Sequence, residues 1–145
     1  MFFLPLLDRE WRLPGLPRTQ PHVIAWLLLL AMLAAPVAWT PHYPELVLTG
    51  LLFTALPEEW FFRAYFMERI GTGWRANLIT SALFSLMHGL TRDWTTALLV
   101  FLPSLFYGWL YQRTRDLPLL VLVHALSNVM FSLFLTQYVA AFLGK

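Results

Sequence analysis

Three ionisable side chains interrupt an otherwise apolar stretch, and this feature constrains the fold most. Between Leu46 and Phe66 the chain places Glu58, Glu59 and Arg63 among mostly apolar and aromatic residues. In a single membrane helix, the nine Leu, Val and Phe residues before Arg63 contribute about −3 to −5 kcal/mol to insertion, and the three charges cost about +7 to +10 kcal/mol. Such a helix barely inserts alone, so other segments must pair with its charges. Ionisable residues inside a membrane indicate a functional site by default.

The composition supports a membrane location. Of 145 residues, 59% are hydrophobic and 12% are charged, whereas an average soluble domain is about 25% charged. We therefore expect one polytopic domain embedded in the lipid bilayer. The absence of cysteine excludes a thiol nucleophile, a thiolate metal site and disulfides. The net charge of +2 gives no indication of a nucleic-acid partner, and we predict none, and no metal or cofactor.

Five apolar segments are long enough, or nearly so, for the ~20 residues that span a bilayer as a helix. The predicted fold is therefore an all-α transmembrane bundle of about five spans. Residues 1–20 combine a short apolar patch with charges and prolines, and we expect an amphipathic segment lying on the bilayer, followed by a single transmembrane domain over residues 21–145. The predicted spans are 22–39, 45–67, 76–90, 95–111 and 117–142, with a turn at 40–44 and polar loops at 68–75, 91–94 and 112–116.

The basic residues predict how the bundle is oriented. Five spans place the N-terminus and the loops 68–75 and 112–116 on one side of the membrane. These segments hold seven of the ten basic residues, whereas the other side holds two. Because cytoplasmic segments are enriched in Lys and Arg, the N-terminus is predicted to be cytoplasmic. The seven are Arg9, Arg12, Arg18, Arg69, Arg75, Arg113 and Arg115; the two are Arg92 and Lys145.

Polar residues from three predicted spans lie at similar depth. With a rise of about 1.5 Å per residue, Glu58 and His124 lie about 10 Å from the cytoplasmic side, Asn128 about 16 Å and His88 about 18 Å. His124 and Asn128 are four residues apart and share a helix face. We therefore expect these four side chains to converge between the cytoplasmic half and the middle of the bilayer.

The two adjacent glutamates are expected to have different roles. Glu59 and Arg63 are four residues apart with the acid first, which is the favourable order for a pair. Glu58 lies about 100° away from Glu59 around the helix, so the two side chains cannot point at one spot. We predict that Glu59 and Arg63 neutralise each other and that Glu58 faces the cavity.

This set of residues suits hydrolysis by an activated water molecule. A base takes a proton from water, and hydrogen-bond donors stabilise the oxyanion that forms on the attacked carbonyl. Glu58 with His88 can activate the water, and His124 with Asn128 can supply the donors. The sequence contains neither a G-x-S-x-G elbow nor an H-E-x-x-H zinc helix.

Three motifs in order resemble those of the CPBP family, also called ABI, which comprises CAAX prenyl proteases and bacteriocin-processing enzymes. The resemblance covers about Pro57 to Asn128, half of the chain. It includes the aromatic stretch Phe106–Tyr111. The motifs are Glu58-Glu59-x-x-x-Arg63, Phe84-x-x-x-His88 and His124-x-x-x-Asn128.

The resemblance implies a glutamic-type intramembrane protease built as a helical bundle. It assigns water activation to Glu58 and His88, the oxyanion site to His124 and Asn128, and a supporting role to Glu59 and Arg63. It implies a membrane-anchored or C-terminal-tail protein or peptide as the substrate, in protein sorting or peptide maturation. We expect a multi-pass protein of a bacterial inner membrane, thin enough to associate into a homo-oligomer.

Two other interpretations stay open at this point. Glu58, His88 and His124 form a His₂Glu set that ligand chemistry permits for zinc, which would make the chain a zinc-dependent membrane protease. Alternatively, the chain is a non-catalytic immunity or scaffold protein of the same fold. Resistance to chelators would argue against the first, and loss of the biological effect in Glu58→Ala would argue against the second.

Overall fold

The structure is a computed structural model that describes residues 4–8, 10–11, 20–35, 43–135 and 141. Every regular element in these ranges is helical, which confirms the all-α prediction. The elements are α1 (Leu4–Leu7), α2 (Gln20–Ala34), α3 (Tyr43–Thr49), η2 (Gly50–Ala55), α4 (Leu56–Glu59), η3 (Trp60–Met67), α5 (Glu68–Ile70), α6 (Trp74–Thr91), α7 (Trp94–Thr114), α8 (Leu117–Met130) and η4 (Phe131–Leu135), where η marks π-helical segments.

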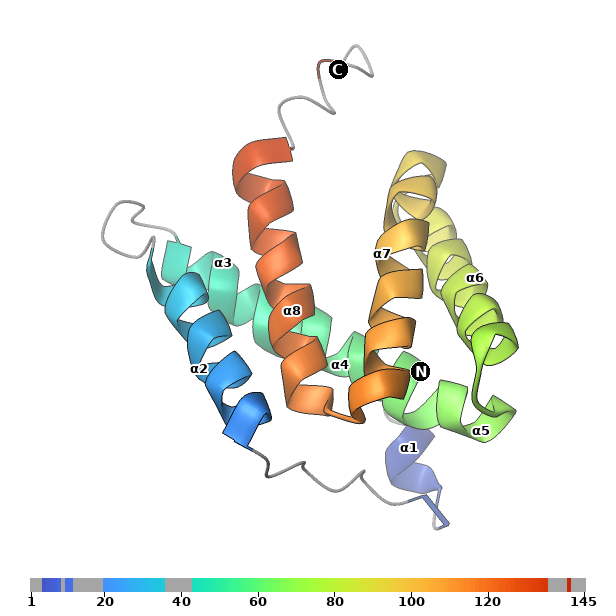
Figure 1. Cartoon of the computed structure of the whole chain (residues 1–145). Coiled ribbons are helices and arrows are strands. Elements are labelled where there is room, and N and C mark those ends of the chain that lie inside the picture. The colour runs from blue at the N-terminus through green and yellow to red at the C-terminus, as the bar shows by residue number, and fades with distance from the viewer. Residues whose placement is uncertain (1–3, 9, 12–19, 36–42, 136–140, 142–145) are drawn as a thin grey trace.

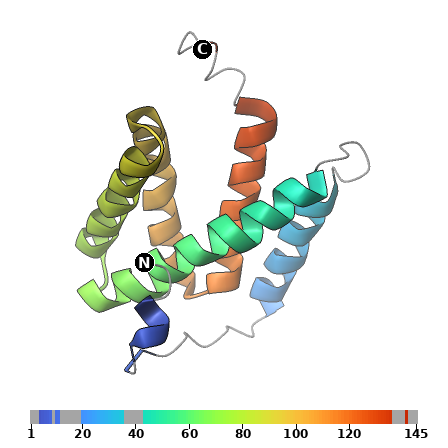
Figure 2. The same ribbon diagram turned by 180° about the vertical axis from the view of Figure 1, so that it is seen from behind.

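One long helix organises the molecule. Elements α3 to α5 follow one another without a break from Tyr43 to Ile70, and Figures 1 and 2 show this helix running obliquely across the bundle, from α3 beside α2 to α5 near the start of α6. Helices α2 and α8 pack on each other and α8 packs on η2, whereas α6 packs on α7 and on η3. The two helix pairs therefore stand on different halves of the long helix. Helices α7 and α8 meet at their connection and diverge toward their other ends in both views.

The connections between helices are shorter than the sequence predicts. The predicted loop 68–75 is reduced to three residues, because the long helix continues to Ile70 and α6 begins at Trp74. Gly71 and Gly73 adopt φ of 118° and 99°, which glycine adopts readily and other residues rarely. The predicted loop 112–116 is likewise reduced to two residues, because α7 runs to Thr114.

Asp116 fixes the short connection between α7 and α8. Its carboxylate caps α8 by accepting from the N–H of Leu119 at 2.9 Å. The same side chain is fully buried and contacts two side chains of α2, His22 at 2.6 Å and Trp26 at 2.8 Å. One carboxylate therefore ties the start of α2 to the start of α8. His22 belongs to this tie.

Two helices in the described ranges are long and apolar enough to cross a membrane, by length and composition. They are Trp94–Thr114 and Leu117–Phe134; a shorter apolar helix covers His22–Ala34. The count of five spans, the cytoplasmic N-terminus and the division into 1–20 and 21–145 stay predictions. Several residues on which they rest lie outside the described residues: Arg9, Arg12, Arg18, Lys145, most of the turn 40–44, and the ends of the first and last predicted spans.

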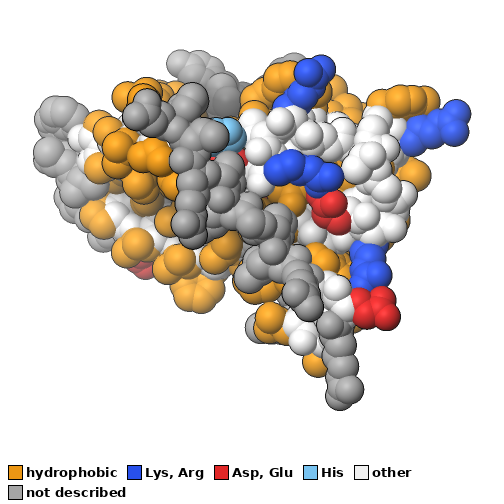
Figure 3. All heavy atoms as spheres, turned by 60° about the horizontal axis from the view of Figure 1, so that its bottom comes forward, with side chains coloured by type: hydrophobic (Ala, Val, Ile, Leu, Met, Phe, Trp, Pro, Cys, Tyr) orange, Lys and Arg blue, Asp and Glu red, His pale blue; other side chains and the backbone are white. Residues whose placement is uncertain are grey.

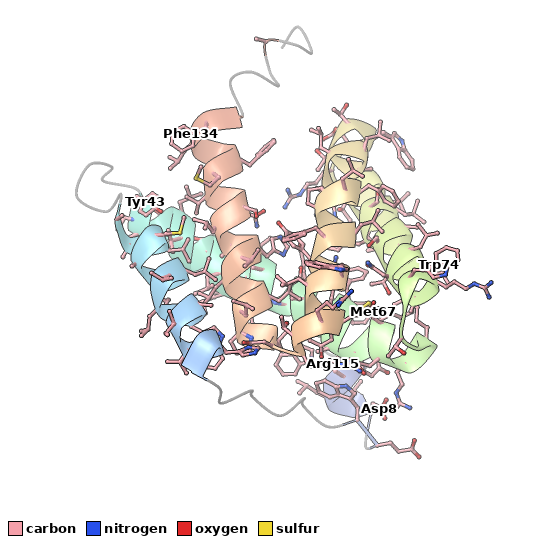
Figure 4. All side chains as sticks on the ribbon, in the orientation of Figure 1. Asp8, Tyr43, Met67, Trp74, Arg115 and Phe134 are labelled. Carbon is pink, nitrogen blue, oxygen red and sulfur yellow. The ribbon has the colours of Figure 1, made fainter. Side chains whose placement is uncertain are left out.

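The buried apolar side chains form two clusters. The larger lies around Tyr43, Met67, Tyr111 and Leu120, and the smaller consists of Phe61, Phe62 and Phe84 with their neighbours. Charged side chains gather instead on one part of the base, seen end-on in Figure 3. At this end Asp8 pairs with Arg69 and Glu68 pairs with Arg115, and Figure 4 labels Asp8 and Arg115 there.

Candidate active site

The two glutamates lie near the middle of the long helix, between two π-helical segments. Glu58 and Glu59 end the short element α4, with η2 before them and η3 after them. Pro57 has no N–H to donate, so it removes a hydrogen bond from the regular helical ladder at this point. Short π-helical segments are frequent at functional sites, and the two carboxylates lie between two such segments.

Glu58 lies between two imidazole rings that come from different helices. Its Oε1 is 3.9 Å from Nε2 of His88 on α6, and its Oε2 is 3.7 Å from Nε2 of His124 on α8. The side chains are mostly buried, with 13%, 11% and 6% of their surfaces exposed. Elements far apart in the sequence thus bring the imidazoles of two predicted site residues within 4 Å of the Glu58 carboxylate.

The orientation of His88 follows from its other ring nitrogen. Nδ1 of His88 lies 3.0 Å from the carbonyl oxygen of Phe84, one turn earlier on α6. A carbonyl only accepts, so Nδ1 carries the proton in this contact. In the neutral ring Nε2 is then an acceptor, and it faces Glu58. The ring also lies against the ring of Phe84, with centroids 4.4 Å apart.

Glu59 pairs with Arg63 as predicted, and it also binds His124. Its Oε1 accepts from Nη1 of Arg63 at 3.2 Å and lies 2.7 Å from Nδ1 of His124. Glu59 and Arg63 are completely buried. The two glutamates do not point at one spot, as their spacing predicts, but both reach His124. They do so from different sides of the ring, Glu58 at Nε2 and Glu59 at Nδ1.

Two residues of α7 that sequence reasoning missed complete this network. Ser104 accepts two hydrogen bonds from Nη2 of Arg63, at 2.6 Å to its hydroxyl and 3.0 Å to its carbonyl oxygen. Tyr107 stacks on the ring of His124, with centroids 4.9 Å apart and planes at 25°. The only signal in the sequence was a lone hydroxyl after Pro103 in an apolar segment, followed by a tyrosine one turn later.

Asn128 joins the site through its helix rather than through a contact. It lies one turn after His124 on α8 and is half-buried. Among the described residues its side chain has no hydrogen-bond partner. The amide is therefore available to donate to another group on the face of α8 that carries His124.

The geometry permits proton transfer next to hydrogen-bond donors. Glu58 can accept a proton from water, and His88 presents an acceptor nitrogen to it. Because Nδ1 of His124 faces a carboxylate, this nitrogen donates, and Nε2 donates as well only when the ring carries both protons. Within the described part of the chain, no group of three or more His, Cys, Asp or Glu residues is arranged to hold a metal ion, so the zinc interpretation gains no support from geometry.

Comparison with protein families gives one match. The model of a family described as type II CAAX prenyl endopeptidase Rce1-like matches residues 19–130. This range contains all six residues predicted to form the site. Comparisons with curated proteins and with solved structures found no match.

Proposed function

Because the chain belongs to the type II CAAX prenyl endopeptidase Rce1-like family, a family of membrane proteases, we propose that it is a glutamic-type intramembrane endopeptidase. It hydrolyses a peptide bond of a membrane-associated protein or peptide. The observation that carries this proposal is the position of Glu58 between the Nε2 atoms of His88 and His124, at 3.9 and 3.7 Å.

In the proposed reaction a water molecule attacks the carbonyl carbon of the scissile bond. Glu58 accepts a proton from this water, and Nε2 of His88 can share it. The new C–O bond leaves negative charge on the carbonyl oxygen, which the amide of Asn128 and doubly protonated His124 stabilise by donation. When the intermediate collapses, the C–N bond breaks and the proton passes to the leaving amine. The products are one carboxylate and one amine.

The remaining two motif residues, Glu59 and Arg63, support this chemistry through their contacts with His124 and with each other. Glu59 holds Nδ1 of His124 at 2.7 Å, and Arg63 balances the charge of Glu59. A hydrogen bond from Nδ1 to this buried carboxylate fixes the orientation of the ring from which Nε2 would donate. The proposed role of His124 as an oxyanion donor therefore depends on Glu59.

We further propose that the substrate is a C-terminal sorting tail or leader peptide rather than a prenylated CAAX peptide. The described helices around the site form a small bundle, which favours a short peptide tail over a bulky prenyl group. A dedicated sorting or maturation partner in a bacterial inner membrane fits such a bundle. Efficient cleavage of farnesylated CAAX peptides by the purified protein would contradict the proposal.

The test compares two carboxylates of the same long helix. Cells co-express a tagged reporter with wild-type protein, Glu58→Gln or Glu45→Gln. Reporters carry a C-terminal membrane tail, a leader peptide or a prenylated CAAX end. Glu45 is exposed near the start of α3, so Glu45→Gln makes the same chemical change away from the site. We expect Glu58→Gln to reduce cleavage by at least about 100-fold, because general bases contribute roughly 10²–10⁴-fold.

Protein abundance in the membrane fraction is measured for every variant, so that a loss of cleavage is not a loss of protein. Undiminished cleavage by Glu58→Gln would refute the glutamic mechanism. Cleavage that persists without Glu58 but disappears with a chelator would favour the zinc alternative. A biological effect that survives Glu58→Gln when no reporter is cleaved would favour the non-catalytic alternative.

A further inference from the structure

We propose that Ser104 is a positioning residue of the active site, which acts on His124 through Arg63 and Glu59. It lies on α7, outside the three motifs. The proposal rests on the proposed function, because it assumes that the orientation of His124 matters for hydrolysis.

A continuous set of buried hydrogen bonds connects Ser104 to His124. Nη2 of Arg63 donates to the hydroxyl and to the carbonyl oxygen of Ser104, at 2.6 and 3.0 Å. Nη1 of the same guanidinium donates to Oε1 of Glu59 at 3.2 Å, and this oxygen accepts from Nδ1 of His124 at 2.7 Å. Ser104, Arg63 and Glu59 are fully buried, so water does not compete for these groups.

Ser104 limits the positions that the guanidinium can take. A guanidinium is planar and its donors have fixed directions. Anchoring Nη2 on α7 therefore fixes the direction in which Nη1 reaches Glu59. The ring of Phe84 lies 4.8 Å from the guanidinium carbon and leaves the hydrogen bonds to determine rotation in the plane. Without the hydroxyl, one N–H of Nη2 loses its acceptor and the guanidinium can turn toward another.

A displacement of Arg63 affects His124 through one atom that both residues contact, Oε1 of Glu59. Both Arg63 and His124 use Oε1 of Glu59, and Oε2 has no hydrogen-bond partner among the described residues. When Arg63 turns, the carboxylate can follow it, because no second hydrogen bond holds its other oxygen. The Nδ1 hydrogen bond of His124 then lengthens, and its Nε2 moves relative to Glu58. The carbonyl of Ser104 still holds Nη2, so the displacement is partial.

The first measurement is steady-state kinetics of the purified full chain on the reporter that the wild type cleaves. Ser104→Ala is compared with Ser81→Ala, an equally buried serine on α6 that bonds to Asn77 instead of Arg63. We expect Ser104→Ala to lower kcat on the order of tenfold with KM unchanged, as is typical when a group that orients a catalytic residue is lost. Ser81→Ala should leave kcat within about twofold of the wild type, because it lies outside the chain of contacts that leads to His124.

A pair of isosteric variants separates the hydroxyl from the volume of the side chain. Ser104→Thr and Ser104→Val add the same bulk, and only Thr keeps the acceptor. We expect Ser104→Thr to recover at least about half of the kcat that Ser104→Val loses, because the two side chains have nearly the same shape and differ in the hydroxyl that accepts from Arg63. Comparing Ser104→Thr with Ser104→Val tests the role of the hydroxyl even when Ser104→Ala folds poorly.

The second measurement reads His124 directly and needs no activity. The full chain is labelled with ¹⁵N-histidine, and the ring signals of His124 are assigned by their loss in His124→Gln. We expect a protonated Nδ1 in the wild type and in Ser81→Ala, and a changed Nδ1 signal in Ser104→Ala that Ser104→Thr restores.

These results distinguish the two proposals. If wild-type protein cleaves no reporter, or Glu58→Gln cleaves normally, the proposed function fails and the His124 signal still decides the role of Ser104. An unchanged His124 signal in Ser104→Ala, or a kcat equal to that of Ser81→Ala, overturns the role of Ser104 and leaves the proposed function standing. A fall in kcat that Thr does not rescue relative to Val also overturns it.

Discussion

The buried pair Glu59–Arg63 offers the sharpest test of how the site is held together. Replacing Arg63 by Met removes the guanidinium that pairs with the buried Glu59 carboxylate, and replacing Glu59 by Gln removes the carboxylate that pairs with the buried guanidinium. Both side chains are completely buried and 3.2 Å apart. The double variant Glu59→Gln/Arg63→Met removes both charges at once.

The burial of the pair sets the expected magnitude. Breaking a buried pair by removing one partner costs about 3–5 kcal/mol, because the remaining charge stays uncompensated. We expect each single variant to lose stability in this range. The double variant should lose less than the sum of the singles, with a coupling energy of about 2–3 kcal/mol, as for residues in direct contact.

The assay is denaturant unfolding of the full chain in detergent micelles, followed by the fluorescence of its seven tryptophans. Arg115→Met is the matched control, because Arg115 pairs with Glu68 at a site where 47% and 29% of the side chains are exposed. Exposed pairs contribute about 0–1 kcal/mol, so the same substitution should have little effect there. Single variants as stable as Arg115→Met, or a double variant that equals the sum of the singles, would refute the reasoning.

Two further predictions concern how the helices are held. Gly108→Ala places a methyl group 1.9 Å from Oδ1 of buried Asn77 and is expected to lower the free energy of unfolding by about 1–3 kcal/mol, as overpacking does; Gly50→Ala meets open space and should change it by less than about 1 kcal/mol. Asp116→Ala removes the cap of α8 and the acceptor of two α2 side chains, so it should cost more than the roughly 0.5–2 kcal/mol of a cap alone. Asp93→Ala removes the exposed cap of α7 and gives the reference value in thermal unfolding. An equal loss of stability in Asp116→Ala and Asp93→Ala would contradict the contact of Asp116 with α2.

The sequence predicted the helices and their order, and it misplaced some of their ends. Polar residues such as Glu68 and Gln112 follow apolar spans, and this pattern predicts loops at their positions. In the structure Glu68 pairs with Arg115, and Gln112 donates to the carbonyl of Gly73. Tertiary partners of this kind allow a helix to continue into polar sequence, and no local pattern reveals them. The two glycines with positive φ mark the actual break.

The site was predictable where a single helix determined it. The pairing of Glu59 with Arg63 follows from their spacing, and similar depth was enough to bring Glu58 near His88 and His124. The hydrogen bond between Glu59 and His124 was not predictable, since it depends on how α8 is rotated against the long helix. The angle of 100° between the glutamates around the helix keeps their side chains from meeting at one point. An imidazole has two nitrogens on different sides, so it can receive two carboxylates that diverge.

The arrangement of the helix pairs has a mechanical consequence. His88 stands on the α6–α7 pair and His124 on the α2–α8 pair, while Glu58 lies on the long helix against which both pairs pack. The Glu58 carboxylate therefore lies between the two helix pairs. A change in the angle between the pairs alters the distance between the imidazoles of His88 and His124. Membrane helices tilt to match the thickness of the surrounding bilayer. Lipid tail length would thus adjust the spacing of these rings with no change in the amino-acid sequence.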